Sequence, residues 1–349
     1  MTRFLDLIVT DIERTTRDAV AVTLARADGR PVDWSPGQYL TFRREVDGVE
    51  IRRSYSICAG PGAPLRIGVK RVPGGAFSTW ANESLKVGDR LEALPPMGRF
   101  TLPEAQGPRH VLLFAAGSGI TPILSLLHAL MAEPETRVTL VYANRNVNTI
   151  MFREELEDLK NRHMGRLSIL HILSGGQEIP LFSGRIDAAK LDALFATWID
   201  GTSVDLAMIC GPEAMMKVIA EGLARHGIDP GAIRYELFGS AQPGRLKRAE
   251  IRAEAVKPTA ATVTLDGAAL SFDMGRDQSL LDAAIAAGLD APFACKAGVC
   301  STCRCRVIEG EVEMAANHAL EDYEVARGFV LSCQSYPLTD RIVVDYDQL

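Results

Sequence analysis

Four of the seven cysteines have the spacing of ligands to an iron–sulfur cluster. Cys295, Cys300 and Cys303 form a C-x₄-C-x₂-C run, and Cys333 lies further along the chain. This spacing holds a plant-type [2Fe–2S] cluster, in which four thiolates surround two irons. Gly298 leaves room for backbone N–H groups to approach the cluster sulfurs and stabilise their negative charge. The run therefore predicts an electron-transfer centre.

Two other uses of these cysteines have to be weighed. A structural zinc site usually takes paired C-x₂-C knuckles, and only one such pair is present. Cysteines are also common as small buried core residues. The spacing favours the cluster over both alternatives. We expect Cys305, two residues beyond Cys303, to be a half-buried thiol in a strand and not a fifth ligand.

A glycine-containing segment could hold the phosphates of a dinucleotide. It follows an apolar run and precedes a helical pattern, so its glycines and the helix N-terminus could approach a pyrophosphate. A lone G-x-G is weak support, and a proline replaces the third glycine of the usual fingerprint. The residues predicted to bind here are Gly117, Ser118, Gly119, Thr121 and Pro122.

The end of the next predicted strand bears on which nucleotide binds. NAD sites usually place an acid there to hold the ribose 2′-OH, whereas NADP sites place a base. Asn144 and Arg145 follow this strand, Arg153 lies close behind, and no acid intervenes. We therefore expect NADPH rather than NADH. The alternative is that Arg145 only pairs with Glu154 or Glu155 on the following helix.

Three blocks and a linker are predicted to position these residues. Residues 1–105 contain short strands between Pro-Gly turns, which is typical of an antiparallel barrel or sandwich. Residues 106–238 alternate strands and helices, as in a doubly wound parallel sheet. Residues 239–261 show no apolar stripe and are predicted to be a linker. Residues 262–349 carry the cysteine cluster.

The expected elements are short and end at glycines or prolines. The strands of the first block are Leu5–Val9, Ala19–Leu24, Gln38–Phe42, Ile51–Cys58, Leu65–Arg71 and Arg90–Ala93. In the second block the helix Pro122–Met131 has Thr121 as its N-cap, and the helix Glu213–His226 ends at Gly227. The last block begins with the hairpin Thr262–Phe272 and the helix Ser279–Ala287.

The charge is unevenly distributed. The net charge of −6 argues against a nucleic-acid partner. Residues 262–349 hold 14 acidic and 6 basic residues, whereas residues 1–261 hold 30 and 32. The acidic module could dock against a basic patch, or its charge could simply keep a small domain soluble. With no leader pattern and no long apolar run, we expect a cytoplasmic protein with reduced thiols and no membrane partner.

Residues 262–349 resemble a plant-type ferredoxin, and the order of the blocks is similar to that of reductase components of bacterial multicomponent oxygenases. Arg53-Ser54-Tyr55-Ser56 matches the R-x-Y-S motif of the ferredoxin–NADP reductase superfamily. The resemblance implies that Arg53 holds the flavin pyrophosphate, Tyr55 covers the isoalloxazine and Ser56 bonds flavin N5. A guanidinium can fork onto a pyrophosphate, which suits the first role. Taken alone, the tetrapeptide could be a chance strand.

A second motif of this family, Gly74–Ser78, follows about twenty residues later. The resemblance implies that backbone N–H groups and a serine hydroxyl take up pyrophosphate oxygens there. Both phosphate motifs are intact, which favours FAD over FMN. The implied flavin site consists of Arg53, Ser54, Tyr55, Ser56, Val69, Lys70, Gly75, Ala76, Phe77, Ser78 and Phe238.

Cys210-Gly211-Pro212 follows another predicted strand and precedes a helix. The resemblance places all three in the nucleotide site, with Cys210 beside the nicotinamide C4. A buried apolar cysteine is the alternative. Phe238 ends the block and is implied to shield the flavin until nicotinamide displaces it. Ser56, Cys210 and Phe238 are thus the predicted catalytic residues.

The resemblance implies both a fold and a function. The fold is an antiparallel FAD-binding β-barrel, a doubly wound parallel α/β nicotinamide-binding domain and a C-terminal β-grasp ferredoxin-like domain. The function is NADPH-dependent reduction of FAD, followed by single-electron transfer through the [2Fe–2S] cluster to a terminal oxygenase. The implied oxygenase is a di-iron enzyme of an acyl-CoA epoxidase complex, acting on an aromatic acyl-CoA.

Other functions share some or all of these motifs. Reductases of ring or steroid hydroxylases carry the same set, so the acceptor stays open. A redox sensor would need the cluster but no hydride donor, and the intact nicotinamide motif argues against it. A scaffold with decayed motifs is a further alternative.

Overall fold

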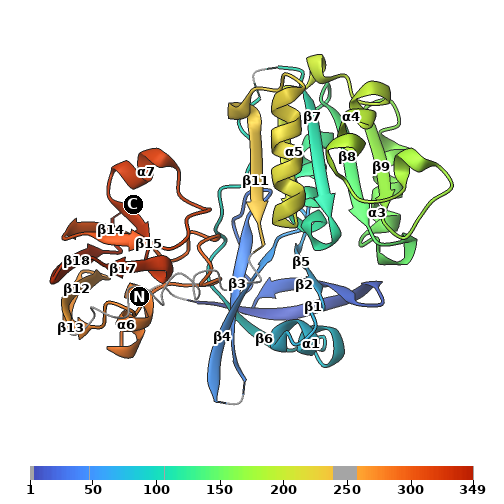
Figure 1. The fold of residues 1–349 in the computed structure, drawn as a ribbon. Coiled ribbons are helices and arrows are strands. Elements are labelled where there is room, and N and C mark those ends of the chain that lie inside the picture. The colour runs from blue at the N-terminus through green and yellow to red at the C-terminus, as the bar shows by residue number, and fades with distance from the viewer. Residues whose placement is uncertain (1–3, 47, 106, 239–257, 349) are drawn as a thin grey trace. The chain divides into compact units, whose positions relative to one another are not determined.

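The computed structural model describes residues 4–46, 48–105, 107–238 and 258–348. These residues divide into two compact units, one over residues 4–238 and one over residues 258–348 (Figure 1). Most of the predicted linker lies outside the described residues. No helix within the described ranges is long and apolar enough to cross a membrane.

The first sheet of the larger unit is antiparallel and closes on itself. Its six strands run in the order β4-β3-β6-β1-β2-β5. A bridge between Ile57 and Ile67 joins the segment after β4 to β5, which closes the barrel. The elements are β1 (Leu5–Thr16), β2 (Ala19–Arg26), β3 (Tyr39–Val46), β4 (Val49–Ser56), β5 (Leu65–Lys70), the helix α1 (Ala76–Glu83) and β6 (Arg90–Ala93).

Period-2 alternation places apolar side chains inside this barrel. Leu7, Val22, Leu40 and Phe42 are fully buried, and Phe77 of α1 packs against the same core. The sequence pattern missed α1 because the helix has no side-chain N-cap and no acidic residue in its first turn. It also ended β1 too early, since the second half of that strand is largely exposed and carries bulges.

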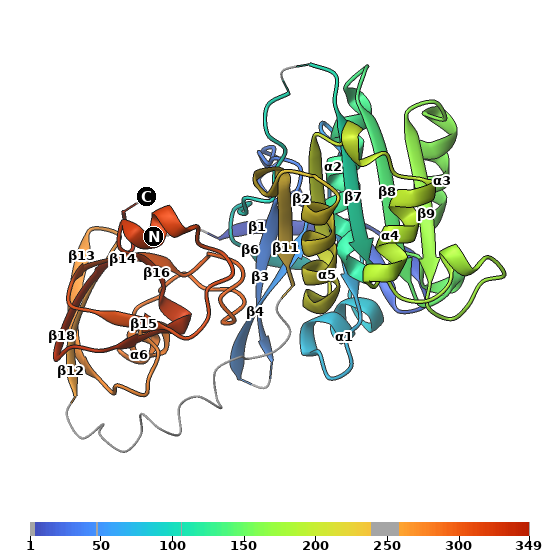
Figure 2. The ribbon, with the colours of Figure 1, turned by 45° about the horizontal axis from the view of Figure 1, so that its top comes forward.

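The second sheet of the larger unit is entirely parallel, in the order β11-β10-β7-β8-β9. Helices α2 and α3 cover one face and α4 and α5 the other, as Figures 1 and 2 show. The bounds are β7 (His110–Ala116), α2 (Ile120–Ala132), β8 (Arg137–Asn144), α3 (Arg153–Arg162), β9 (Leu167–Leu173), α4 (Ala188–Thr197), β10 (Leu206–Gly211), α5 (Glu213–Arg225) and β11 (Ile233–Leu237).

The strands of this sheet are nearly continuous apolar runs because both faces are covered. Leu113 and Leu140 face α2 and α3, whereas Phe114 and Val141 face α4 and α5. The chain order reverses between β7 and β10, so a crevice forms at the carboxyl ends of these two strands. The doubly wound sheet expected from the sequence is confirmed.

The start of α2 differs from the expectation. A 3₁₀ turn over Gly117–Gly119 leads directly into the helix, which therefore begins at Ile120 and not at Pro122. Thr121 is not the N-cap, because its hydroxyl donates to the Ser118 carbonyl oxygen at 2.9 Å instead of accepting an N–H. The sequence pattern could not show this, since it treated the glycine motif as an irregular loop.

The smaller unit contains a mixed sheet in the order β13-β12-β18-β14-β16, with β12 and β18 parallel. Helix α6 packs Leu280, Leu281 and Ala284 against it, which is the expected β-grasp arrangement. The elements are β12 (Thr259–Leu265), β13 (Ala268–Met274), α6 (Leu280–Ala286), β14 (Arg304–Glu309), β15 (Val312–Met314), α7 (Asp322–Ala326), β16 (Phe329–Leu331), β17 (Ser335–Pro337) and β18 (Arg341–Asp345).

The first strand of this unit begins earlier than expected. Thr259–Ala261, assigned to the linker from the sequence, already pair with β13 and β18. Alanines and a threonine next to Pro258 give no strong strand signal. The pairing of Thr259 with Met274 of β13, and of Ala260 and Ala261 with β18, extends the strand to Thr259.

A close backbone contact in the barrel gives a test of this architecture. Gly37 has φ +92°, and a Cβ added to it would lie 1.9 Å from the Phe100 carbonyl oxygen. We expect Gly37→Ala to lower the free energy of unfolding by about 2–4 kcal/mol, measured by urea unfolding.

The matched control is Gly62→Ala. Gly62 has φ +75° with no atom within 4 Å of an added Cβ, so only the left-handed backbone is penalised. We expect a loss of about 1 kcal/mol. Equal losses for the two variants would contradict the close contact.

Candidate active site

The glycine motif lies at the crevice between β7 and β10. A Cβ on Gly119 would lie 2.2 Å from the Cys210 carbonyl oxygen, so only glycine lets the loop touch the end of β10. Gly117 has φ +53°, and a Cβ on it would lie 3.4 Å from Lys70 Nζ. The 3₁₀ turn Gly117–Gly119 opens this helical segment, so its own N–H groups have no preceding turn to bond to. These features make a cradle that fits an anionic group such as a pyrophosphate.

Two cations meet beside this cradle. Lys70, implied to contact flavin, lies against the Gly117 loop, and its pKa is lowered by burial and by the nearby Arg145 charge. Neither cation forms an ion pair with another residue in the described ranges. Two unneutralised cations at one place favour an anionic ligand.

Asn144 ends β8 with its side chain buried and without partners. It is 8% exposed, and neither its amide nitrogen nor its amide oxygen has a hydrogen bond to a described residue. An orphaned buried amide costs stability unless a ligand completes it. The structure therefore fits Asn144 as a ligand-binding group.

The alternative role for Arg145 is not supported. Glu155 is instead bound by Arg66 and His128, and Arg145 itself is exposed. Arg153 pairs with Glu157 one helical turn away at 2.8 Å. Both arginines stay predicted nucleotide contacts.

The R-x-Y-S motif ends β4 and contains one buried hydroxyl group without a hydrogen-bond partner. Ser56 is 3% exposed, and its Oγ has no hydrogen-bond partner among the described residues. Tyr55 packs against Phe77 with ring centroids 5.2 Å apart, and burial raises its pKa. Ser54 Oγ lies 3.0 Å from Thr41 Oγ1. The unpaired hydroxyl of Ser56 fits the predicted bond to a flavin nitrogen.

Arg53 carries the other predicted contact of this motif. Its side chain is exposed, and its Nη1 donates to the Arg52 carbonyl oxygen at 2.7 Å. The remaining donors of the guanidinium leave capacity for a phosphate.

The second flavin motif forms the N-terminus of α1. Gly75 is the N-cap, so the N–H groups of Ala76 and Phe77 have no intrahelical acceptors. Ser78 Oγ accepts the Val72 N–H at 3.1 Å and donates to the Gly75 carbonyl oxygen at 3.2 Å. Because its single hydrogen is already donated, we infer that Ser78 shapes the turn. The expected contact of Ser78 with pyrophosphate would require this bond to break.

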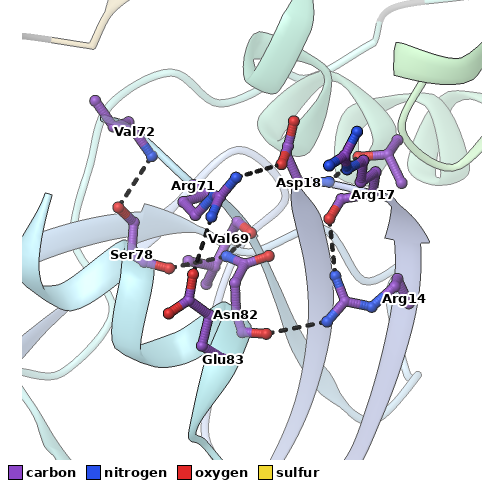
Figure 3. A network of polar contacts seen from close by, with 10 residues as sticks. Arg14, Arg17, Asp18, Val69, Arg71, Val72, Ser78, Asn82 and Glu83 are labelled. Atoms are coloured by element: carbon purple, nitrogen blue, oxygen red, sulfur yellow. Dashed lines mark hydrogen bonds and ion pairs between the residues drawn. The ribbon is translucent and has the colours of Figure 1, made fainter. Parts of the chain in front are cut away.

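A polar network holds α1 against the end of β5 (Figure 3). Asn82 Nδ2 donates to the Val69 carbonyl oxygen at 3.1 Å and to a carbonyl of α1 itself at 2.9 Å. Arg71 bridges Asp18 and Glu83, each at 2.9 Å. The network fixes Val69 beside the start of α1. Sequence spacing gave no signal for Asn82, because its partners are backbone carbonyls.

Cys210 and Glu236 face each other across β10 and β11, where they are register partners. The thiol is fully buried, and its pKa is raised by burial and by the Glu236 charge. Glu236 keeps some exposed surface as a residue, but its Oε2 is buried without a partner. Burial raises the pKa of Glu236 to about 8. Phe238 follows β11 and is 40% exposed.

Sequence reasoning missed Glu236. One acid in a strand that also exposes Tyr235 resembles an ordinary surface residue. Only the parallel pairing with β10 places it beside Cys210. The remaining predicted nucleotide residues, Gly211 and Pro212, lie at the end of β10 and at the N-cap of α5.

The cysteine loop curves around its own thiols. Lys296, Gly298 and Ser301 have φ values of 52°, 75° and 49°, which bend the chain repeatedly. The Ala297 N–H donates to Cys295 Sγ at 3.3 Å, the kind of bond that stabilises cluster sulfurs.

The four predicted ligands form two pairs. The pKa of Cys295 is lowered to about 6, mainly by the Cys300 thiol and further by backbone N–H groups. The Cys303 thiol likewise lowers the pKa of Cys333. Among the described residues, no group of three or more cysteine, histidine or acidic side chains is placed to hold a single metal ion. Two pairs of thiols fit two irons that share bridging sulfides.

Cys305 differs in degree from the expectation. It lies in β14, between β16 and β18, and is fully buried rather than half-buried. Its side chain belongs to the core of the smaller unit, and burial raises its pKa.

The fold and the site define a class of oxidoreductase that binds FAD and a pyridine nucleotide and carries its own [2Fe–2S] domain. Three family models match the chain. They are the oxidoreductase FAD-binding domain over residues 6–102, the oxidoreductase NAD-binding domain over 113–221, and the 2Fe-2S iron-sulfur cluster binding domain over 263–338.

Relatives match over the whole length. The chain is 42% identical to a subunit of the 1,2-phenylacetyl-CoA epoxidase of Escherichia coli strain K12, over 99% of each chain. It is 33% identical to the ferredoxin reductase component of 3-ketosteroid-9-alpha-monooxygenase of Mycobacterium tuberculosis, over 99% of this chain and 96% of the relative. The chain belongs to this family of reductase components and is an NAD(P)H oxidoreductase.

The same three folds also occur together in a solved structure. Phthalate dioxygenase reductase, described as a modular structure for electron transfer from pyridine nucleotides to [2Fe–2S], matches with a TM-score of 0.63 at 24% identity. The match covers 98% of both chains.

The buried carboxyl of Glu236 predicts a pH-dependent stability. Its pKa of about 8 in the folded state exceeds its ordinary value of 4.5, so the native state holds a proton that the unfolded chain releases. Stability should therefore fall as pH rises from about 5 to 8, by at most about 1.4 kcal/mol per pH unit. We expect Glu236→Gln to remove this slope, measured as the melting temperature between pH 5 and 9.

The control is Glu221→Gln on the exposed face of α5, which should leave the slope unchanged. Parallel melting curves for wild type and Glu236→Gln would contradict the buried, protonated carboxyl.

Proposed function

We propose that this chain is an NADPH-dependent reductase that delivers single electrons to a di-iron oxygenase acting on an aromatic acyl-CoA thioester. The 42% identity to a component of a phenylacetyl-CoA epoxidase, over the full length, carries the proposal for the acceptor. Arg145, which follows β8, supports the proposal for the donor. When bound, FAD takes a hydride from the nucleotide and releases its two electrons singly through the cluster.

On the flavin side, the residues of the barrel bind and orient. Arg53 and the N-terminus of α1 would hold the pyrophosphate of FAD, since both offer unused N–H donors. Tyr55 would lie against the ring, and Ser56 Oγ would bond a ring nitrogen. Ser56 is buried at the end of β4, so water cannot easily replace that bond.

On the nicotinamide side, Cys210 and Glu236 set the polarity of the crevice. Burial is the main cause that raises the pKa of Cys210, and any charge on Glu236 adds to it. The residue therefore stays a neutral thiol at neutral pH. It therefore acts as a small, soft neighbour and not as a nucleophile. Glu236, with a pKa of about 8, holds a proton at its carboxyl and can donate it in a hydrogen bond. Phe238, exposed after β11, would cover the flavin when no nicotinamide is bound.

Arg145 supports NADPH over NADH. A 2′-phosphate would find Arg145 at the end of β8, where an NAD site would carry an acid. Lys70, which lies against the Gly117 loop, would bind the pyrophosphate that NADH and NADPH share. An NADH site would leave the exposed charge of Arg145 unused.

Nucleotide choice can be tested with Arg145→Ala. We expect kcat/KM for NADPH to fall about 10–100-fold, the usual loss for a charge-assisted bond, with less than threefold change for NADH. The assay is steady-state reduction of ferricyanide. Arg137→Ala, at the opposite end of β8, is the matched control and should change neither value. An unchanged preference for NADPH would exclude Arg145 as the specificity residue.

The acceptor can be tested by reconstitution with the oxygenase components of a phenylacetyl-CoA epoxidase. We expect NADPH-driven conversion of phenylacetyl-CoA by wild type and none by Cys333→Ser, which should lose the cluster while keeping NADPH:ferricyanide activity. Coupling to a ketosteroid or glycine betaine monooxygenase instead would reassign the partner. No steady turnover of NADPH with any acceptor, despite bound FAD and cluster, would favour the redox sensor.

A further inference from the structure

A partly buried charge cluster joins the barrel to the parallel sheet within the larger unit. Arg66 of β5 donates through Nη2 to both carboxylate oxygens of Glu155 on α3, each at 2.7 Å. His128 of α2 donates through Nε2 to Glu155 Oε1, also at 2.7 Å. The three side chains, here named the Glu155 cluster, are only 20–24% exposed. No residue of this cluster belongs to the site described above.

Tight neutral contacts surround the Glu155 cluster. Ser125 Oγ of α2 donates to the Ala59 carbonyl oxygen at 2.7 Å in a fully buried bond. A Cβ on Gly68 would lie 2.5 Å from Thr121 Cγ2 and 3.1 Å from the Phe152 ring. The barrel and the α2 side of the sheet are therefore in direct contact, with no space for a side chain at Gly68.

Phe152 lies in the same contact and has a strained backbone conformation. It has φ +57° and ψ +32°, a left-handed conformation that costs a bulky residue about 1–2 kcal/mol. Its ring is 5% exposed and lies 5.3 Å from the Arg66 guanidinium. Such strain persists only where the surroundings over-determine the conformation. The interface thus holds the start of α3 in one position.

The residues of the Glu155 cluster lie on elements that also carry, or directly adjoin, the flavin and nucleotide contacts. On the barrel side, Arg66 lies on the strand that carries Lys70 and also donates to the Cys58 carbonyl oxygen at 3.4 Å, two residues after Ser56. On the sheet side, α2 begins directly after Gly119, and α3 follows the segment that carries Arg145. A shift of the cluster would therefore move both flavin and nucleotide contacts.

We propose that the Glu155 cluster positions the nucleotide-binding half against the flavin-binding half, and so sets the rate of hydride transfer rather than the affinity for either cofactor. A misplacement of reacting groups by about 1 Å can slow a reaction about 100-fold. The inference rests on the proposed function only in requiring transfer from a pyridine nucleotide to FAD. It does not depend on NADPH over NADH or on the acceptor.

The test compares Glu155→Gln and Arg66→Lys with wild type. Glu155→Gln keeps the shape and removes the charge, whereas Arg66→Lys keeps the charge and removes the planar guanidinium. In rapid mixing with saturating nucleotide, we expect FAD reduction to slow at least tenfold. The nucleotide dissociation constant should change less than threefold, and electron transfer from reduced FAD to the cluster should be unchanged.

A second readout does not depend on turnover. Hydrogen exchange of amides in residues 65–70 and 153–162 should be at least tenfold faster in both variants, because the interface opens more often. Amides of β12 in the smaller unit should exchange as in wild type.

The matched control is Glu133→Gln. Arg109 also binds both carboxylate oxygens of Glu133, through Nε at 3.1 Å and Nη2 at 2.6 Å, but both residues lie within the sheet half. We expect a comparable loss of melting temperature with FAD reduction within twofold of wild type.

The outcomes separate the two proposals. Wild-type rates of FAD reduction in both Glu155→Gln and Arg66→Lys, or an equal slowing in Glu133→Gln, would overturn the positioning role. If Glu155→Gln does not fold, Arg66→Lys alone decides by the same criteria. If neither NADPH nor NADH reduces the wild-type protein, that result would instead contradict the proposed function.

Discussion

The active site depends on one close backbone approach, between Gly119 in the loop after β7 and the Cys210 carbonyl at the end of β10. An added Cβ at Gly119 would lie 2.2 Å from that oxygen. Because the loop touches β10 directly, the N-terminus of α2 and the Cys210 thiol converge on one crevice. The register of β10 and β11 then adds Glu236. A side chain at Gly119 would separate the elements that form the site.

The polar groups around this crevice are arranged for a ligand rather than for stability. Ser56 Oγ, both amide atoms of Asn144 and Glu236 Oε2 are buried without partners among the described residues. Each such group costs about 1–3 kcal/mol unless something else completes it. They come from β4, β8 and β11, so no local interaction explains them together. Groups on FAD and on a pyridine nucleotide would supply the missing partners.

The site for electron uptake and the site for electron release are built in different ways. The uptake site lies between a barrel and a parallel sheet, which meet through the Glu155 cluster and the tight contact at Gly68. The release site lies in a separate compact unit, where one short loop and Cys333 form two thiol pairs. Hydride transfer requires ring contact, whereas the cluster can pass an electron without it. The tight interface therefore belongs to the uptake site. A docking role for the acidic surface of the smaller unit stays a prediction.

The sequence by itself determined the features that are local in the chain. The C-x₄-C-x₂-C run, the Gly117–Pro122 motif and the alternation of strands and helices each lie within a short segment, so spacing alone revealed them. Local signals failed at Thr121, where a 3₁₀ turn extended the helix, and at Thr259–Ala261, where pairing with β13 and β18 extended β12.

Only the tertiary structure decided which distant residues meet. The pairing of Cys210 with Glu236, the approach of Lys70 to the glycine loop and the Glu155 cluster all join segments far apart in sequence. Such contacts follow from strand register and from the packing of one domain half on the other. Neither leaves a periodic trace along the chain, and Glu236, Lys70 and Glu155, each seen alone, resemble ordinary surface charges.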